Sequence, residues 1–365
     1  MACGKKKAPP AFEAASYRER AGVPAIAFAA VTRDATVLLG AEGKKDASRP
    51  DLATSDTAFE AASIAKTIIA TCVMQLVEDK RLRLDEDVSS YVGFTVRHPR
   101  STAAISLRML LSHTSSIRDR NDELARATRA EPLGRYLEGY LVKSGKPDPD
   151  AFDPKGPGET AAYSNVGASL AALAVERMTK TSFDVYATTH IFVPLDMRRT
   201  AWAASALDDT ASGHTFVGGR FVRAPAPSHA VYPVVDLFSS SHDLSRFARA
   251  ILRGGELDGV RILSAESIRV MQGKIGAYDD ALGWQLRTIG SGRAAGHEGE
   301  DVGASTALFL DMNAGAGAVV LANGDAFSSE NAARAKALQG LLADLLDRAR
   351  TSATQGRPVS SRDAD

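Results

Sequence analysis

The stretch "FEAASIAKTI", residues 59–68, places Ser63 and Lys66 three positions apart at the start of an apolar pattern. Residues with this spacing lie on one face of a helix, so the hydroxyl and the amine can touch. The pair could be an N-capping serine with a solvated lysine, or a nucleophile beside its base. The apolar positions continue to Val77 with a helical period and two apolar neighbours per turn, which predicts a buried helix. A buried helix is a poor place for a solvated lysine, so the pattern favours the catalytic interpretation.

The composition is typical of a globular enzyme. The 365 residues include 44 basic and 44 acidic side chains, and hydrophobic residues make up 44%. Nucleic acid is not expected as the main partner, because phosphate binding needs concentrated positive charge. No apolar run approaches the roughly 18 residues of a membrane-spanning helix.

The two cysteines imply no disulfide framework. Cys72 falls within the apolar helical pattern and is expected to be a buried small hydrophobe. Cys3 lies in "MACGKKKAPP", residues 1–10, which we interpret as a flexible tether. It resembles the mature start of a bacterial lipoprotein, with Met-Ala in place of the signal peptide. That interpretation predicts a periplasmic, lipid-anchored protein; the alternative is an incidental cysteine in a tag-like terminus, which leaves a cytoplasmic location open.

Strand signals lie near both ends of the chain, and helical patterns lie between them. The signals are a helix over 11–20, a strand hairpin over 25–40, a second hairpin over 304–323 and a closing helix from near Ser328. We therefore expect an α/β (α+β) fold, with an antiparallel sheet flanked by helices and an inserted all-helical lobe. The predicted boundaries are a tether at 1–10, an α/β lobe at 11–60 and 200–350, a mainly helical lobe at 61–199, and a disordered tail at 351–365.

Three further segments carry candidate site residues. "PGETAAYSNVG" contains Tyr163 and Asn165, "AAGHEGEDVGAS" contains His297, Gly299 and Glu300, and "LRMLLSHTSSI" contains His113. The order S-x-x-K, Y-x-N, H-x-G resembles the serine β-lactamase and penicillin-binding protein superfamily over roughly residues 20–345. The H-x-G in place of K-T-G looks most like the class C-related branch, which includes family VIII carboxylesterases and low-molecular-weight DD-peptidases.

The resemblance implies a serine hydrolase that forms an acyl-enzyme on Ser63. A serine hydroxyl must lose its proton as it attacks, and Lys66 or Tyr163 could accept that proton. A tyrosinate at neutral pH costs roughly 4 kcal/mol of electrostatic help, which Lys66 could partly supply as a cation. Lysine as the base would need burial to lower its pKa. Both assignments stay open at the level of sequence.

The resemblance also implies the remaining roles. The backbone N–H groups of Ser63 and Glu300 would bind the oxyanion. Gly299 is the last residue of the H-x-G motif and directly precedes Glu300. Asn165 would orient the lysine and the acyl group. His297 would line the pocket and donate to the substrate or to Tyr163, although a purely structural histidine is the alternative. His113 is expected to support a turn and not to act in catalysis.

Neither a metal nor a cofactor is expected. "HEGED", residues 297–301, lacks the spacing of a zinc site. Asp148, Asp150 and Asp153 invite a calcium interpretation, but Phe152 sits where a ligand would be needed, which favours a solvated loop. The absence of a G-x-S-x-G elbow disfavours an α/β-hydrolase.

The departures from the family pattern bear on the substrate. In β-lactamases the lysine and hydroxyl of K-T-G help to hold the substrate carboxylate, whereas this chain has an imidazole and an acid, followed by Glu300 and Asp301. Acidic groups repel a carboxylate, so we expect a carboxylesterase acting on small neutral esters, or a preference for substrates with a free amine. The alternatives are a β-lactamase, DD-peptidase or D-aminopeptidase, or a non-catalytic penicillin- or cell-wall-binding lipoprotein.

Ser116 and Asp196 replace usual glycines and predict altered turns. The oligomeric state cannot be predicted.

Overall fold

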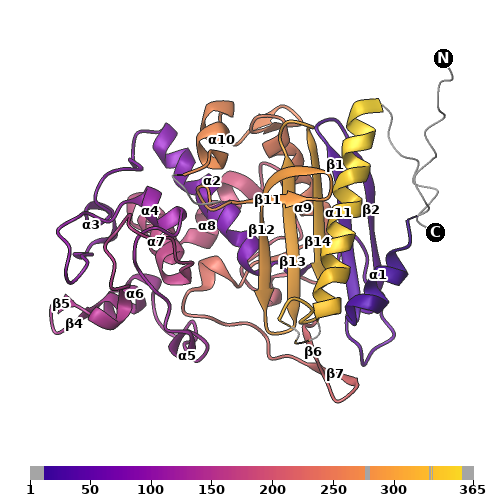
Figure 1. Cartoon of the computed structure of the whole chain (residues 1–365), viewed down its shortest axis with the longest axis horizontal. Coiled ribbons are helices and arrows are strands. Elements are labelled where there is room, and N and C mark those ends of the chain that lie inside the picture. The colour runs from indigo at the N-terminus through magenta and orange to yellow at the C-terminus, as the bar shows by residue number, and fades with distance from the viewer. Residues whose placement is uncertain (1–11, 276–279, 329, 331, 356–365) are drawn as a thin grey trace.

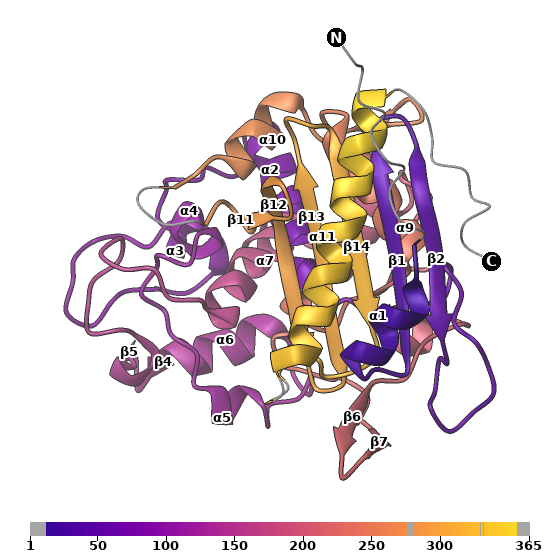
Figure 2. The same cartoon turned by 45° about the vertical axis from the view of Figure 1, so that its right-hand side comes forward.

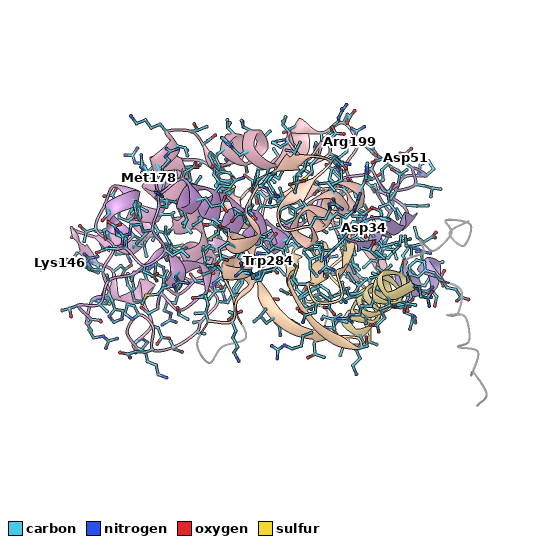
Figure 3. The ribbon with its side chains drawn as sticks, turned by 90° about the horizontal axis from the view of Figure 1, so that it is seen from above. Asp34, Asp51, Lys146, Met178, Arg199 and Trp284 are labelled. Atoms are coloured by element: carbon cyan, nitrogen blue, oxygen red, sulfur yellow. The ribbon has the colours of Figure 1, made fainter. Side chains whose placement is uncertain are left out.

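The computed structural model describes residues 12–275, 280–328, 330 and 332–355. Figure 1 shows a sheet with its covering helices on the right and a helical lobe on the left. In Figure 3, Lys146 marks the outer end of the helical lobe and Trp284 lies near the middle of the molecule. Trp284 is buried and belongs to one apolar core that includes residues of both lobes. The two lobes therefore share this core.

The sheet has six antiparallel strands in the order β11-β12-β13-β14-β1-β2. Their bounds are β1 Ala25–Thr32, β2 Thr36–Gly43, β11 Gln285–Ile289, β12 Gly292–Asp301, β13 Ala304–Asp311 and β14 Ala316–Ala322. The pairing of β1 with β14 joins the two ends of the chain in one sheet. The expected antiparallel sheet flanked by helices is thus confirmed, and both predicted hairpins are part of it.

Helices cover both faces of the sheet. Figure 2 shows α11, Ala332–Gln355, lying in front of the strands, and α1, Ala14–Ala21, packs beside it. On the other face lies α9, Ser241–Leu252. Every residue of β1 is buried, and alternate positions join the two cores: Ile26 and Phe28 face α11, whereas Ala27 and Ala29 face the α9 side. This is the period-2 alternation of a strand that is covered on both faces.

The helical lobe is built around α7, Asn165–Thr179, which packs on α2, α3, α4, α6 and α8. The bounds of its neighbours are α2 Ala65–Glu78, α3 Ser89–Val92, α4 Leu107–Leu111, α5 Asn121–Leu124, α6 Leu133–Leu141, α8 Phe183–Ala187, β4 Val142–Lys143 and β5 Lys146–Pro147. α7 is buried from Val166 to Val175 because small and apolar residues fill this whole stretch. It can therefore hold its N-terminus, which carries Asn165, in a fixed place.

The remaining elements of the described chain are short. They are β3 Phe59–Glu60, β6 His214–Val217, β7 Arg220–Arg223, β8 Phe238–Ser239, β9 Glu256–Leu257, β10 Val260–Arg261 and α10 Ala265–Gln272, with η1 Ala62–Ile64, η2 Pro149–Ala151, η3 Thr188–Phe192, η4 Ala204–Ala206 and η5 Tyr232–Val234. β3 pairs with β8, and the chain runs from β3 directly into η1, which contains Ser63.

The prediction of a disordered tail at 351–365 is wrong for residues 351–355. Residues 351–355 continue α11, with Ser352 buried and the Thr354 hydroxyl donating to the Arg350 carbonyl at 3.2 Å. The polar composition of this segment hid a helix that packing stabilises. Residues 356–365 and the tether with Cys3 lie outside the described residues, so the lipid anchor stays a prediction. Among the described residues, no helix combines the length and apolar character needed to cross a membrane.

The turns at Ser116 and Asp196 keep a glycine-type backbone, so the expectation of altered turns is wrong. Ser116 has a φ of 61° and Asp196 a φ of 54°, both in the left-handed region. This region costs a residue with a Cβ about 1–2 kcal/mol. Ser116 is buried, and within the described part of the chain its hydroxyl has no hydrogen-bond partner. The turn therefore holds both backbone strain and an unsatisfied polar group.

We expect Ser116→Gly to raise the free energy of unfolding by about 1 kcal/mol. The gain from relieving strain and removing the buried hydroxyl exceeds the loss from the greater freedom of glycine in the unfolded chain. Asp196→Gly is the matched control, because that exposed carboxylate pairs with Arg198 and its removal gains less. Urea titration of wild type, Ser116→Gly and Asp196→Gly measures the three free energies of unfolding. A Ser116→Gly variant less stable than wild type would contradict the account of the turn.

Candidate active site

Ser63 sits on a sharp turn between a strand and a helix. β3 ends at Glu60, Ala62 takes a left-handed φ of 47°, and η1 then leads directly into α2. Strain of this kind is common where a side chain must be presented for function. The Ser63 hydroxyl is buried between two groups: the Lys66 Nζ donates to it at 2.9 Å, and the Tyr163 hydroxyl lies 2.8 Å away. The structure thus brings these three predicted residues together.

Lys66 is buried and fully hydrogen-bonded. Its ammonium nitrogen donates to Ser63, to Asn165 Oδ1 at 2.8 Å and to the Val234 carbonyl at 3.3 Å. Burial lowers the pKa of Lys66 to about 7, against the opposing charge of Asp119. The amine is therefore present in both its neutral and its charged form near neutral pH.

Tyr163 just precedes α7 and reaches the nucleophile from the helical lobe. Although 45% of the residue is exposed, desolvation raises the pKa of its hydroxyl, and the hydrogen bond with Ser63 only partly opposes this. Lys66 Nζ lies 4.9 Å from the centre of the ring. Tyr163 is thus held as a neutral phenol beside the serine.

Asp119 fixes the N-terminus of α7, although no pattern in the sequence pointed to this residue. Its carboxylate accepts from the Asn165 N–H at 2.7 Å, the Val166 N–H at 3.1 Å and the Ser164 hydroxyl at 2.9 Å. A carboxylate at a helix N-terminus is stabilised by the unpaired backbone donors there. Asp119 thereby sets the position of Asn165, which in turn orients Lys66.

His113 supports Tyr163 from behind. Its Nδ1 accepts from the Ser164 N–H at 3.2 Å, and its ring centre lies 4.5 Å from that of Tyr163. Burial lowers the pKa of His113 to about 3, and the nearby Lys66 adds to this. His113 is therefore neutral, and its ring accepts a hydrogen bond from a backbone N–H, which positions the turn before α7. Among the described residues it makes no hydrogen bond to Ser63. This is the supporting role that the sequence predicts.

His297 is placed in the site with a different role from the expected one. It is buried on β12, 6.1 Å from the Tyr163 ring by ring centres, and burial holds its pKa well below the usual range. Its Nδ1 donates to the Glu298 carbonyl, which leaves Nε2 without a proton. Nε2 has no partner among the described residues. His297 can therefore accept a hydrogen bond in the site, whereas the sequence suggested a donor.

Gly299 lets β12 pass close to the nucleophile. A Cβ at this position would lie 2.2 Å from Thr306 Oγ1, 2.6 Å from the Ala61 carbonyl oxygen and 3.1 Å from the Ser63 backbone nitrogen. The strand carrying Glu300 is thus packed directly against the backbone N–H of Ser63. This is the arrangement that two oxyanion donors on separate elements require.

We expect Gly299→Ala to lower kcat by about 10²-fold or more, with a smaller effect on KM. The added methyl group must push β12 away from Ser63, and the loss of one oxyanion donor costs a factor of this size. Gly292→Ala, at the other end of the same strand, meets only the ends of two side chains, the Arg350 guanidinium at 3.1 Å and the Asp311 carboxylate at 3.4 Å, and is the matched control. Equal kinetics in the two variants would contradict the close-approach argument.

The site opens into a cleft of about 480 Å³. Its lining residues are Ser63, Tyr163, Asn165, Val235, Gln285, His297, Glu298, Glu300, Phe327, Ala335 and Gln339. The charged residues of the lining are both acidic, Glu298 and Glu300. No group of three or more metal-ligating side chains occurs within the described ranges. A nucleophile, a titratable amine and a phenol in one hydrogen-bonded set can carry out acyl transfer.

Comparisons with known proteins identify relatives of this chain. The chain is 27% identical over 296 residues to "Penicillin-binding protein 4" of Amycolatopsis lactamdurans, which covers 76% of this chain and 74% of that protein. It is 25% identical over 316 residues to "Protein flp" of Staphylococcus aureus, strain MW2, which covers 84% of this chain but only 60% of the relative. The chain therefore spans about three fifths of that second relative.

A solved structure of D-amino acid amidase from Ochrobactrum anthropi SV3 superimposes with a TM-score of 0.72 at 21% identity, covering 92% of this chain and 96% of that one. This likeness shows the fold alone. The model of the Beta-lactamase family matches residues 13–342, nearly the whole of the described chain. The protein therefore belongs to the Beta-lactamase family and is a serine hydrolase of that fold.

Proposed function

We propose that the protein is a carboxylesterase that cleaves small neutral esters through an acyl-enzyme on Ser63. The observation that carries this proposal is the hydrogen-bonded set of Ser63, Lys66 and Tyr163 at the base of a cleft lined by Glu298 and Glu300. The set supplies the chemistry, and the acidic lining selects against anionic substrates.

Lys66 is the better candidate for the base. With a pKa of about 7 it is about half neutral at neutral pH, which costs well under ~1 kcal/mol. Ionising Tyr163 at the same pH costs more than about 4 kcal/mol, because its pKa lies above the ordinary tyrosine value. In this scheme Lys66 takes the proton of Ser63 as the serine attacks the ester carbonyl. The phenol of Tyr163 then protonates the departing alkoxide and regains a proton from the Lys66 ammonium, so that no tyrosinate remains. Water next attacks the acyl-enzyme, gives a proton to Lys66 and releases the carboxylic acid, and Ser63 recovers its proton. The backbone N–H groups of Ser63 and Glu300 hold the oxyanion in both steps.

The acidic lining disfavours the carboxylate of a penicillin or of a peptide C-terminus. Two like charges 4 Å apart repel by roughly 1–4 kcal/mol in a partly solvated site, enough to lower affinity about tenfold or more. Arg287 is exposed on β11 and close enough to contribute to the low pKa of His297, but it is not part of the cleft lining. The acidic charge at the cleft is therefore not offset by a basic residue of the lining.

A second candidate is the hydrolysis of an amide that carries a free amine. The same carboxylates of Glu298 and Glu300 would attract an ammonium group, and a neutral Tyr163 can protonate an amine leaving group. The fold shared with the amidase named above supports this alternative without choosing it.

The test is a panel of p-nitrophenyl acetate, p-nitrophenyl butyrate, nitrocefin and D-alanine p-nitroanilide, run on wild type and on the double variant Glu298→Gln, Glu300→Gln. We expect the esters to have the highest kcat/KM, little changed in the double variant, and nitrocefin turnover to rise about tenfold. Nitrocefin turnover equal to that of the esters in wild type would contradict the proposal. Faster cleavage of the anilide, lost in the double variant, would favour the second candidate.

A further inference from the structure

A carboxyl pair, buried Glu60 and partly buried Asp301, lies beside the active site and takes no part in the scheme above. Glu60 ends β3, and Asp301 ends β12; their carboxyl groups are within hydrogen-bonding reach of each other. Both Glu60 Oε1 and Asp301 Oδ2 are buried, and neither has a hydrogen-bond donor among the described residues. Two ionised carboxylates in this position would repel each other, whereas one shared proton would satisfy both orphaned oxygens.

The pair belongs to a larger titratable network. Asp236 also acts on Glu60 electrostatically. His229 joins the two aspartates, with its Nδ1 2.6 Å from Asp236 Oδ1 and its Nε2 3.7 Å from Asp301 Oδ2. These are the titratable groups that face the pair: Asp301 from β12, Asp236 from the segment after η5, and His229 from the loop before η5. His229 and Asp301 also line a surface pocket of about 260 Å³, which gives protons a route from solvent.

Each carboxylate of the network stands next to a part of the catalytic machinery. Glu60 precedes Ser63 by three residues, and Asp301 directly follows Glu300, whose N–H faces the oxyanion in our scheme. Asp236 lies two residues after Val234, whose carbonyl accepts a hydrogen bond from Lys66. The network therefore links the segments that carry the nucleophile, the second oxyanion donor and an acceptor of the base.

We propose that protonated Glu60, hydrogen-bonded to Asp301, is a positioning residue that holds β3 and β12 together so that Ser63 and the Glu300 N–H share one oxyanion site. Loss of the shared proton places two carboxylates side by side and separates the strands. Because Gly299 of β12 packs closely against Ala61 and Ser63, which follow β3, even a small separation displaces the oxyanion donor. The inference rests on the acyl-enzyme scheme for its catalytic consequence, but not for the contacts themselves.

The pH dependence has a definite sign. Burial, the main cause, and the neighbouring carboxylates hold the pKa of Glu60 well above its usual range. The folded protein therefore keeps this proton at a pH where the unfolded chain has lost it. Stability from this group is lost as the pH rises from the ordinary carboxyl range through the folded pKa. The positioning of the oxyanion donor is lost over the same interval.

The experiment compares wild type with Glu60→Gln, which mimics the protonated acid at every pH. The first readout is the rate at which a fluorophosphonate labels Ser63 between pH 5.5 and 9.5, since this reaction needs the nucleophile and the oxyanion site but no particular ester. Titration of Lys66 affects both proteins and cancels in the ratio. We expect the ratio of wild-type to variant rates to fall about tenfold as the pH rises. A ratio that does not change with pH would overturn the proposal.

Two further variants separate the possible failures. Asp301→Asn removes the same repulsion and should reproduce the pH-independent behaviour of Glu60→Gln, which covers the case in which one variant does not fold. Asp243→Asn is the control: it is buried, its pKa is raised by burial, and it bonds Thr200 and not the network. If wild type is not labelled at all, the Ser63 scheme fails. The pH dependence of the thermal midpoint, wild type against Glu60→Gln, then still decides whether the carboxyl pair shares a proton.

Discussion

Replacing Ser63 with alanine is expected to lower ester turnover by about 10⁴-fold or more. The variant loses the nucleophile itself, and what remains is the small contribution of binding and oxyanion stabilisation to direct attack by water. The fold should be retained, because Lys66 keeps its other two acceptors, Asn165 and the Val234 carbonyl. The measurement is kcat/KM for p-nitrophenyl butyrate, with circular dichroism to check the fold.

Ser169→Ala is the matched control for this variant. Ser169 is also a buried serine of the helical lobe, and its hydroxyl has no partner among the described residues. It does not line the cleft, so its removal should leave turnover within about twofold, as for an ordinary mutation away from functional features. Turnover in Ser63→Ala comparable to that of this control would mean that another group carries out the attack.

Replacing Lys66 with glutamine is expected to lower kcat/KM by about 10³-fold, the range that general-base catalysis contributes. Glutamine can still hydrogen-bond but cannot accept the serine proton. In wild type the deprotonated amine is the active form, so kcat/KM should rise with pH through the Lys66 pKa of about 7. This rising limb should be absent in the variant. A limb that survives in Lys66→Gln would have to belong to a different group.

Asp119→Asn tests the same assignment without removing the base. The charge of Asp119 raises the pKa of Lys66 against the effect of burial, so a neutral asparagine should let that pKa fall. The rising limb should then shift to lower pH. Asp122→Asn, at an exposed carboxylate on α5, is the control and should leave the limb in place. A limb unmoved by Asp119→Asn would argue against Lys66 as the titrating group.

The parts of the fold with short-range signals could be predicted from the sequence. The two hairpins were visible as apolar runs on either side of a turn, and α2 as a helical period from Ile64 onward. The Ser63–Lys66 contact followed from the helical spacing alone, since residues three apart share a face. The order of the six strands and the assignment of helices to each face were not predicted, because no local pattern encodes them.

The contacts that refine the site could not be predicted, because they join distant segments without a periodic signal. Asp119 reaches α7 across 46 residues, and its surroundings in the sequence contain no spacing that distinguishes it from a surface acid. The tautomer of His297 depends on the Glu298 carbonyl, a backbone group that no side-chain pattern reveals. The approach of Glu60 to Asp301 likewise exists only once the chain is folded, because the two residues are far apart in sequence.

The most direct test of the account is to trap the acyl-enzyme. Wild type is mixed with an excess of p-nitrophenyl butyrate, whose good leaving group makes acylation of Ser63 faster than hydrolysis of the acyl-enzyme, then quenched in acid, digested and analysed by mass spectrometry. The account predicts a butyryl group on the peptide that contains Ser63, absent from the same peptide of Ser63→Ala. An adduct on another residue, or steady turnover with no adduct on this peptide under any quench time, would contradict it.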